Sequence, residues 1–199
     1  MSEPLSLAGR IDAIVIGASA GGIEALMTLL PALAPRLLMP IFIVLHLPRD
    51  RPSVLSEIFT PKCRLPVCEA QDKEPVRPGT VYFAPPDYHL LVDEGPALAL
   101  SADELVNFSR PSIDVLFESA AEVYGSRLLG IILTGANEDG AAGLAAVGSA
   151  GGVTIVQQPQ SAQVKSMVLS ALHRNPTSHV LELEGISAAL ATLNEDRAP

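Results

Sequence analysis

The stretch IVIGASAGGIEAL, residues 14–26, constrains the fold of this chain more than any other part of the sequence. Its first residues are apolar and β-branched, which is typical of a buried strand. A glycine-rich turn at residues 17–22 follows, and then apolar residues recur at helical spacing. A strand, a tight turn and a helix form the context in which G-x-S-x-G acts as a nucleophile elbow. Such a turn exposes the Ser19 hydroxyl, and the first amides of the helix face any anion that forms there.

The same turn resembles a dinucleotide-binding loop in outline, but its residues argue against that function. In the fingerprint G-x-G-x-x-G the central glycine lets the backbone approach the pyrophosphate, and this position holds Ser19. An acidic residue is expected after the second strand, where the chain has Leu45 and His46. A Walker-type lysine is also missing from the turn. We therefore predict that the protein uses no cofactor.

Strand and helix patterns alternate along the rest of the chain. Continuous apolar runs separated by helices predict a parallel sheet that is buried on both faces. The proline-rich residues 61–100 predict short strands and a hairpin. We expect one α/β domain over residues 1–199, with a doubly wound, mostly parallel sheet, helices on both faces, a short edge hairpin and residues 1–10 as a tail. The strands are expected at residues 14–16, 40–45, 81–83, 89–92, 128–133, 153–156 and 180–183, and the helices at residues 23–30, 53–58, 111–120, 141–148, 161–172 and 186–193, with Ser53 and Ser161 as caps.

The composition excludes several classes of protein. With 48% hydrophobic and 18% charged residues among 199, the chain is neither disordered nor of low complexity. A net charge of −9 argues against nucleic acid as the main partner, because phosphate binding needs a basic surface. The sequence shows no signal peptide and no apolar run long enough for a membrane span, so we expect a cytoplasmic protein. Cys63 and Cys68 lack the spacing of a zinc or redox motif, and we predict no metal.

Three reactive residues each follow a predicted strand. Ser19 follows the first strand, His46 the second, and Asp139 the strand at residues 128–133. Ligands bind beyond the carboxyl ends of strands in an open parallel sheet, so all three can reach one edge. A serine becomes a nucleophile when an imidazole takes its proton and a carboxylate orients that imidazole. Each residue alone also has a structural interpretation, as a cap, a core histidine or a helix-start acid, but together they favour a hydrolytic triad.

The other histidines are weaker candidates for the base. The α/β-hydrolase order Ser…Asp…His would recruit His173 or His179 in place of His46. His173 falls within or at the end of a predicted helix, and His179 precedes a strand at the opposite edge of the sheet. His89 lies in an edge-like segment, where a surface or structural role is expected. We therefore predict His46 as the base.

Over nearly its whole length the chain resembles the catalytic domain of CheB-type chemotaxis receptor methylesterases. Several separate motifs occur in the order that the family shows, which makes the resemblance specific. They are IGASAGG with Ser19, LHLPRDRPSVL with His46, RPGTVYFAPPDYHL, RPSIDVLFESAA, ILTGANEDGAAGL with Asp139, and GGVTIVQQPQSAQVKSM.

The resemblance implies a fold, an activity and a set of site residues. In the family, the residues at the positions of Ser19, His46 and Asp139 form the catalytic triad within a doubly wound α/β fold. The family removes methyl groups from glutamate methyl esters on chemoreceptor cytoplasmic helices, releases methanol, and in many members also deamidates glutamines. Chemoreceptors are thus the expected partners. Backbone amides at Ala20 and Ala136 are the expected oxyanion donors.

The chain also departs from the family pattern. It starts almost directly at the first strand, so we expect no receiver domain and regulation by a separate protein. Ala136 and Asn137 stand where the best-studied type has Met-Gly, Val168 replaces a usual proline, and residues 175–179 differ as well. We expect these changes to affect substrate choice more than chemistry. Two other functions stay open from the sequence: a signalling or scaffold module without turnover, and a general small-ester hydrolase.

Overall fold

The computed structural model describes residues 5–47, 52–95 and 97–194. Within them, seven parallel strands form one sheet in the order β3-β4-β2-β1-β7-β8-β9, and β5 and β6 form a separate antiparallel pair. The strands are β1 (Ala13–Ala18), β2 (Ile41–Leu45), β3 (Val67–Glu69), β4 (Val81–Phe83), β5 (His89–Asp93), β6 (Ala97–Ser101), β7 (Leu128–Ile132), β8 (Val153–Gln157) and β9 (His179–Leu181). The helices are α1 (Gly22–Leu29), α2 (Leu55–Phe59), α3 (Ile113–Tyr124), α4 (Ala141–Ser149), α5 (Ser166–Arg174) and α6 (Leu183–Ala191). The predicted α/β fold is confirmed.

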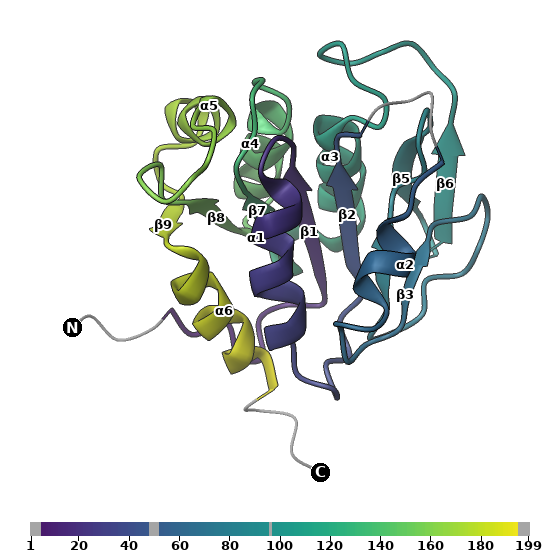
Figure 1. The fold of residues 1–199 in the computed structure, drawn as a ribbon, viewed down its shortest axis with the longest axis horizontal. Helices are drawn as coiled ribbons and strands as arrows, with labels where there is room; N and C mark the ends of the chain where they lie inside the picture. Colours follow the sequence, from purple (N-terminus) through teal and green to yellow (C-terminus); the bar gives the residue numbers. More distant parts are fainter. Residues whose placement is uncertain (1–4, 48–51, 96, 195–199) are drawn as a thin grey trace.

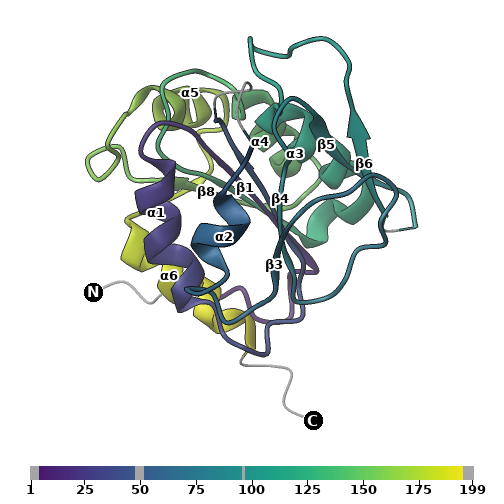
Figure 2. The ribbon, with the colours of Figure 1, turned by 45° about the vertical axis from the view of Figure 1, so that its right-hand side comes forward.

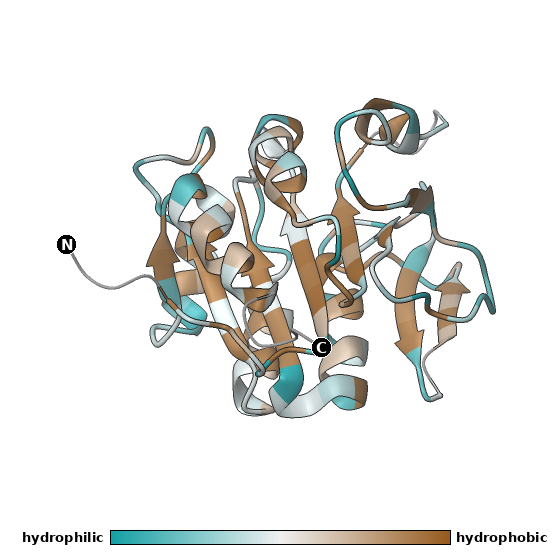
Figure 3. Ribbon diagram, turned by 90° about the horizontal axis from the view of Figure 1, so that it is seen from below, coloured by the Kyte–Doolittle hydropathy of each residue, from teal (hydrophilic) through white to brown (hydrophobic). Residues whose placement is uncertain are grey.

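Helices cover both faces of the sheet. In Figures 1 and 2, α1, α2 and α6 lie on one face, and α3, α4 and α5 lie on the other. The central strands supply both cores because successive side chains point to opposite faces. In β1, for example, Ile14 and Ile16 pack with α1 and α6, whereas Val15 packs with α3. Figure 3 shows the result as central strands that are apolar along most of their length.

The chain reverses its direction of winding next to β1. From β1 it proceeds to β2 and then to the edge strand β3, inserts β4 between β3 and β2, and later returns to place β7 on the other side of β1. The register aligns Gly17 of β1 with Val44 of β2 and Ile132 of β7. The loops after these three strands therefore emerge at the same level, at the edge where doubly wound sheets bind ligands.

The segment at residues 61–100 differs in part from the prediction. The predicted strand at residues 81–83 is not at an edge but lies inside the sheet as β4, between β2 and the unpredicted strand β3. The hairpin β5–β6 stands apart from the large sheet and contacts α3, where the Val92 amide donates to Ser119 Oγ at 3.1 Å. The short, half-buried β3 carries too few residues for a period-2 pattern, which explains why sequence reasoning missed it.

Two predicted boundaries are also wrong. The helix expected from Ser161 begins only at Ser166, because residues before it form a loop in which the Val164 amide donates to Thr134 Oγ1. Ser161 Oγ instead donates to the Gln158 carbonyl oxygen. Part of the expected tail packs into the core: Leu7 is fully buried, and its amide donates to Thr192 Oγ1 at 2.9 Å.

We predict that Gly17 has no room for a side chain. A Cβ on Gly17 would overlap the Ile113 side chain of α3 and lie 3.0 Å from Ile132 Cδ1. Gly17→Ala should therefore lower the free energy of unfolding by about 1–3 kcal/mol, as overpacked core substitutions do. The matched control is Gly130→Ala in β7, where the nearest atom would be 3.1 Å away. Urea denaturation of both variants tests the prediction, and equal stabilities would contradict it.

Candidate active site

Ser19 lies in a turn whose backbone is fixed at both ends. Its amide donates to the Thr134 carbonyl oxygen at 2.9 Å, and its own carbonyl oxygen accepts from the Gly22 amide at 2.8 Å. Gly21 adopts a left-handed conformation with φ of 80°, which glycine tolerates best, and directly precedes α1. The predicted elbow between a strand and a helix is thus present, with Ser19 partly exposed at its turn.

His46 follows β2 and lies one strand away from the Ser19 turn. The His46 amide donates to the Ala18 carbonyl oxygen at 3.1 Å, which continues the pairing of β1 with β2. Its ring is largely buried, with 14% of the side chain exposed, and Nε2 lies 2.9 Å from Asp139 Oδ2. Since a carboxylate accepts only, Nε2 is the donor in this contact, and in the neutral imidazole Nδ1 then has the free lone pair. No hydrogen bond joins His46 to Ser19 Oγ within the described residues.

Asp139 is completely buried and is surrounded by donors. Its Oδ2 accepts from the Ile113 amide at 2.6 Å in addition to His46 Nε2. Its Oδ1 accepts from Ser112 Oγ at 2.8 Å, from Asn107 Nδ2 at 3.0 Å and from the Asp114 amide at 3.3 Å. Two of these donors are amides of the first turn of α3, whose dipole also favours a negative charge. These hydrogen bonds therefore stabilise the ionised form of Asp139.

The two buried carboxylates of this region have opposite pKa shifts. Burial acts to raise the pKa of Asp139, but hydrogen bonds from His46, Asn107 and the Ile113 amide outweigh it, and the pKa lies below its ordinary value. Burial raises the pKa of Asp114, although Asp114 accepts from the Gly143 amide at 2.6 Å and from Asn107 Nδ2 at 2.7 Å. Asp139 is thus the carboxylate held in its charged form.

Thr134 connects the Ser19 turn to the loop that precedes α5. Its Oγ1 donates to the Ala20 carbonyl oxygen at 2.8 Å and accepts from the Val164 amide at 2.9 Å. Its own amide donates to Gln157 Oε1 at 2.9 Å. Ala20 and Ala136 are exposed, and within the described residues neither of their amides donates a hydrogen bond.

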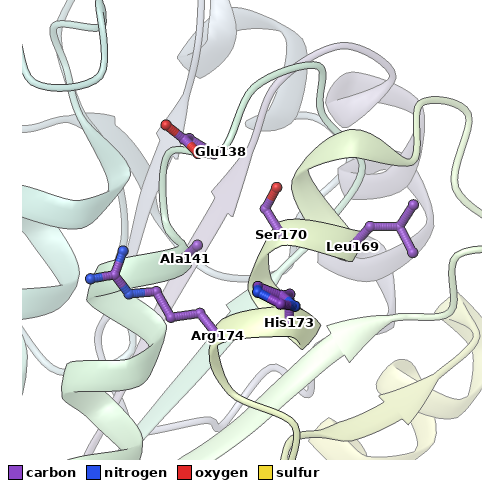
Figure 4. Close-up of a pocket in the computed structure, with 6 residues that line it drawn as sticks. All are labelled: Glu138, Ala141, Leu169, Ser170, His173 and Arg174. Atoms are coloured by element: carbon purple, nitrogen blue, oxygen red, sulfur yellow. The ribbon is translucent and has the colours of Figure 1, made fainter.

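Two depressions lie near the candidate triad. One, with a volume of about 150 Å³, is lined by His46, Leu47 and residues 108–111. The other, with a volume of about 550 Å³, lies between the start of α4 and α5 and includes Glu138 and His173 (Figure 4). Only the first depression is lined by a member of the predicted triad.

Among the described residues, no histidine other than His46 is hydrogen-bonded to Asp139. His173 lines the second depression from α5, and His179 begins the edge strand β9. His89 is buried rather than at the surface: its Nε2 lies 2.9 Å from the Glu104 carbonyl oxygen, and its Nδ1 accepts from the Ser112 amide at 3.1 Å. Of the two roles expected for His89, at the surface or in the structure, these contacts support the structural one. The structure brings Asp139 to His46 alone among these four.

Sequence reasoning missed the residues that surround Asp139. Ser112 and Asp114 stand in the motif RPSIDVLF, which predicts the start of a helix and contributes to the family resemblance but predicts no contact with Asp139. Asn107 gave no signal, because its contact with Asp139 depends on a turn that no local pattern specifies. A buried acid in the first turn of one helix, with a second acid at the start of another, was the signal that could have suggested the pairing.

The described residues contain no group of three His, Cys, Asp or Glu side chains that could hold a metal ion. Among them there is also no helix with the length and apolar character needed to cross a membrane.

Comparisons with known proteins identify relatives of this chain. The family model described as CheB methylesterase matches residues 14–190. A protein from Leptospira interrogans, provisionally named a protein-glutamate methylesterase/protein-glutamine glutaminase, is 45% identical over 185 residues, covering 93% of this chain and 96% of that protein. Protein-glutamate methylesterase/protein-glutamine glutaminase 2 of Caulobacter vibrioides is 36% identical over 93% of this chain, which spans 54% of that longer protein. The crystal structure of the Thermotoga maritima CheB methylesterase catalytic domain superposes with a TM-score of 0.86 at 33% identity, covering 90% of this chain and 97% of that one.

We predict that Asp139→Asn lowers stability in a pH-dependent way. The amide would turn a donor toward backbone and side-chain donors, which should cost about 1–3 kcal/mol at neutral pH. Because the folded-state pKa of Asp139 lies below its ordinary value of 3.8, the stability that the carboxylate contributes is present above that value. It is lost as the pH falls through the lowered pKa. The difference between wild type and variant should therefore shrink below about pH 4.

Chemical denaturation at a series of pH values measures this difference. Glu138→Gln is the matched control, since it removes the neighbouring but exposed carboxylate. A difference for Asp139→Asn that stays constant down to about pH 3, or that the Glu138 variant reproduces, would contradict the prediction.

Proposed function

The chain belongs to the CheB methylesterase family, the protein-glutamate methylesterase/protein-glutamine glutaminases of chemotaxis, and we propose that Ser19, His46 and Asp139 are its catalytic triad. The observation that carries this proposal is the 2.9 Å hydrogen bond between His46 Nε2 and the buried Asp139, at the same sheet edge as the Ser19 elbow. It orients an imidazole at the sheet edge where the partly exposed Ser19 lies, which is the arrangement that nucleophilic catalysis requires.

In the proposed acylation step, Ser19 Oγ attacks the γ-carbonyl carbon of a glutamate methyl ester. His46 takes the serine proton on Nδ1, because Nε2 is held by Asp139. The ionised Asp139 stabilises the imidazolium that forms. The bond between the carbonyl carbon and the methoxy oxygen then breaks, and His46 Nδ1 gives its proton to the departing methanol.

Hydrolysis of the acyl-enzyme repeats these roles with water. His46 Nδ1 removes a proton from the water that attacks the ester of Ser19, and it returns a proton to Ser19 Oγ as the glutamate carboxylate leaves. A glutamine side chain would form the same acyl-enzyme with release of ammonia. We include deamidation in the proposal because the names of the relatives carry both activities.

Oxyanion stabilisation is assigned to the amides of Ala20 and Ala136. Both residues are exposed, and Thr134 Oγ1 fixes the Ser19 turn by donating to the Ala20 carbonyl oxygen. An amide needs no side chain for this role, so the departure at Ala136 leaves the donor in place. One such donor typically contributes about 10²–10³ in rate.

Membership of the family supports a proposal for the physiological substrate and location. We propose that the substrates are methylated glutamates on the cytoplasmic helices of chemoreceptors, which would also be the macromolecular partners. We propose that the protein is cytoplasmic and that residues 1–199 form one methylesterase domain. The proposed mechanism uses neither a metal nor a cofactor.

We predict that Ser19→Ala lowers kcat for methanol release by at least about 10³-fold, since the nucleophile is lost while the fold is kept. Ser170→Ala is the matched control, because this serine lines the depression between α4 and α5, which contains no member of the predicted triad (Figure 4). Methanol release from a methyl-labelled receptor fragment is the measurement.

Three outcomes would argue against the proposed function. Equal activity of wild type and Ser19→Ala would exclude Ser19 as the nucleophile. Wild type without activity on any ester would favour a scaffold module that does not turn over. Far faster hydrolysis of short p-nitrophenyl esters than of methylated receptor would favour a general small-ester hydrolase.

A further inference from the structure

A fully exposed aromatic side chain lies beside the candidate active site. Phe108 is 97% exposed, whereas the other exposed large apolar side chains of the described residues are 41–52% exposed. The segment that carries it, between β6 and α3, rises beyond the carboxyl ends of the strands in Figures 1 and 2. Exposure of a whole phenyl ring to water is unfavourable, so this position calls for an explanation.

The backbone at Phe108 is also held in an unfavourable conformation. Val106 and Ser109 form an antiparallel bridge, with amide-to-carbonyl distances of 3.2 and 2.8 Å. The two residues between them, Asn107 and Phe108, both have positive φ, at 49° and 59°. Glycine and asparagine are the residues that usually occupy such a turn. An aromatic residue here is disfavoured by backbone sterics as well as by exposure.

Side-chain hydrogen bonds join this turn to the candidate active site. Asn107 Nδ2 donates to Asp139 Oδ1 and to Asp114 Oδ2, at 3.0 and 2.7 Å. Asn137 Nδ2, from the loop after β7, donates to Ser109 Oγ at 3.3 Å. The ring of Phe108 is therefore carried by a turn whose position is fixed relative to the carboxylate that orients His46.

Phe108 separates two depressions of the surface. On one side it lines the depression of about 150 Å³ that contains His46. On the other side it lines an open depression of about 660 Å³ together with Glu104, Leu105 and Arg110. A polypeptide with one side chain in the His46 depression would pass over Phe108 to reach the depression lined by Glu104, Leu105 and Arg110. Leu105, 41% exposed, extends the apolar surface in that direction.

We propose that Phe108 is a substrate-docking residue that packs against an apolar side chain flanking the modified glutamate in the receptor polypeptide. The inference rests on the proposed function and adds to it the residue that distinguishes a protein substrate from a small ester. Burial of an aromatic side chain at a contact with a partner is a common source of binding energy. The rigid turn reduces the conformational entropy that docking would otherwise cost.

The test compares two substrates for each variant. One is a methylated receptor fragment, and the other is N-acetyl-glutamate γ-methyl ester amide, which has the reacting group without flanking side chains. For Phe108→Ala, the ratio of kcat/KM for the fragment to kcat/KM for the small ester should fall about tenfold, as for a typical hot-spot truncation. The fall should appear mainly in KM, and Phe108→Tyr should restore most of the ratio because it keeps the ring.

The control is Leu169→Ala, which removes an apolar side chain that is 52% exposed. Leu169 lines the depression of about 550 Å³ between α4 and α5, which Phe108 does not line (Figure 4). An unchanged ratio for Phe108→Ala, or a larger change for Leu169→Ala, would overturn the docking proposal. Equal losses on both substrates would also overturn it, because they would show that Phe108 acts through the Asp139 network. Wild type inactive on both substrates would instead refute the proposed function itself, and the docking role with it.

Discussion

The structure of this site depends on one buried carboxylate and the hydrogen bonds that keep it ionised. A charged group without partners is not tolerated in a protein interior, so Asp139 requires donors. It receives five, from His46, Asn107, Ser112 and the amides of Ile113 and Asp114. They come from the loop after β2, the turn before α3 and the first turn of α3. Satisfying one charge thereby fixes the relative positions of segments that are far apart in the sequence.

At the N-termini of α3 and α4, an acidic residue of each segment accepts hydrogen bonds from amides of the other helix. Asp139, just before α4, accepts from the first amides of α3, while Asp114, in the first turn of α3, accepts from the Gly143 amide of α4. Close approach of the two helices is needed for these hydrogen bonds. It is possible because Gly143 has no side chain: a Cβ there would lie 2.6 Å from Phe117 Cβ and 2.9 Å from Asp114 Cα. The close packing of α3 and α4 thus permits the hydrogen bonds that stabilise the charge of Asp139.

Much of the fold could be predicted because its signals are local. The glycines of the Ser19 turn, the apolar strands and the alternation with helices give the doubly wound sheet, and the sheet brings the loops of Ser19, His46 and Asp139 to one edge. The network around Asp139 could not be predicted, since Asn107 reaches it only through a turn with two positive φ angles. The start of α5 was misplaced for a similar reason: tertiary hydrogen bonds to Thr134 hold the preceding residues out of the helix.

In the proposed mechanism, Asp139 binds His46 through Nε2 and leaves Nδ1 to act on Ser19. A crystal structure of the protein after reaction with a fluorophosphonate tests it most directly, because the adduct on Ser19 Oγ imitates the tetrahedral intermediate. We expect His46 Nδ1 at about 2.6–3.2 Å from an oxygen of the adduct, with Nε2 still hydrogen-bonded to Asp139. An adduct on another residue, or His46 Nε2 turned from Asp139 toward the adduct, would contradict it.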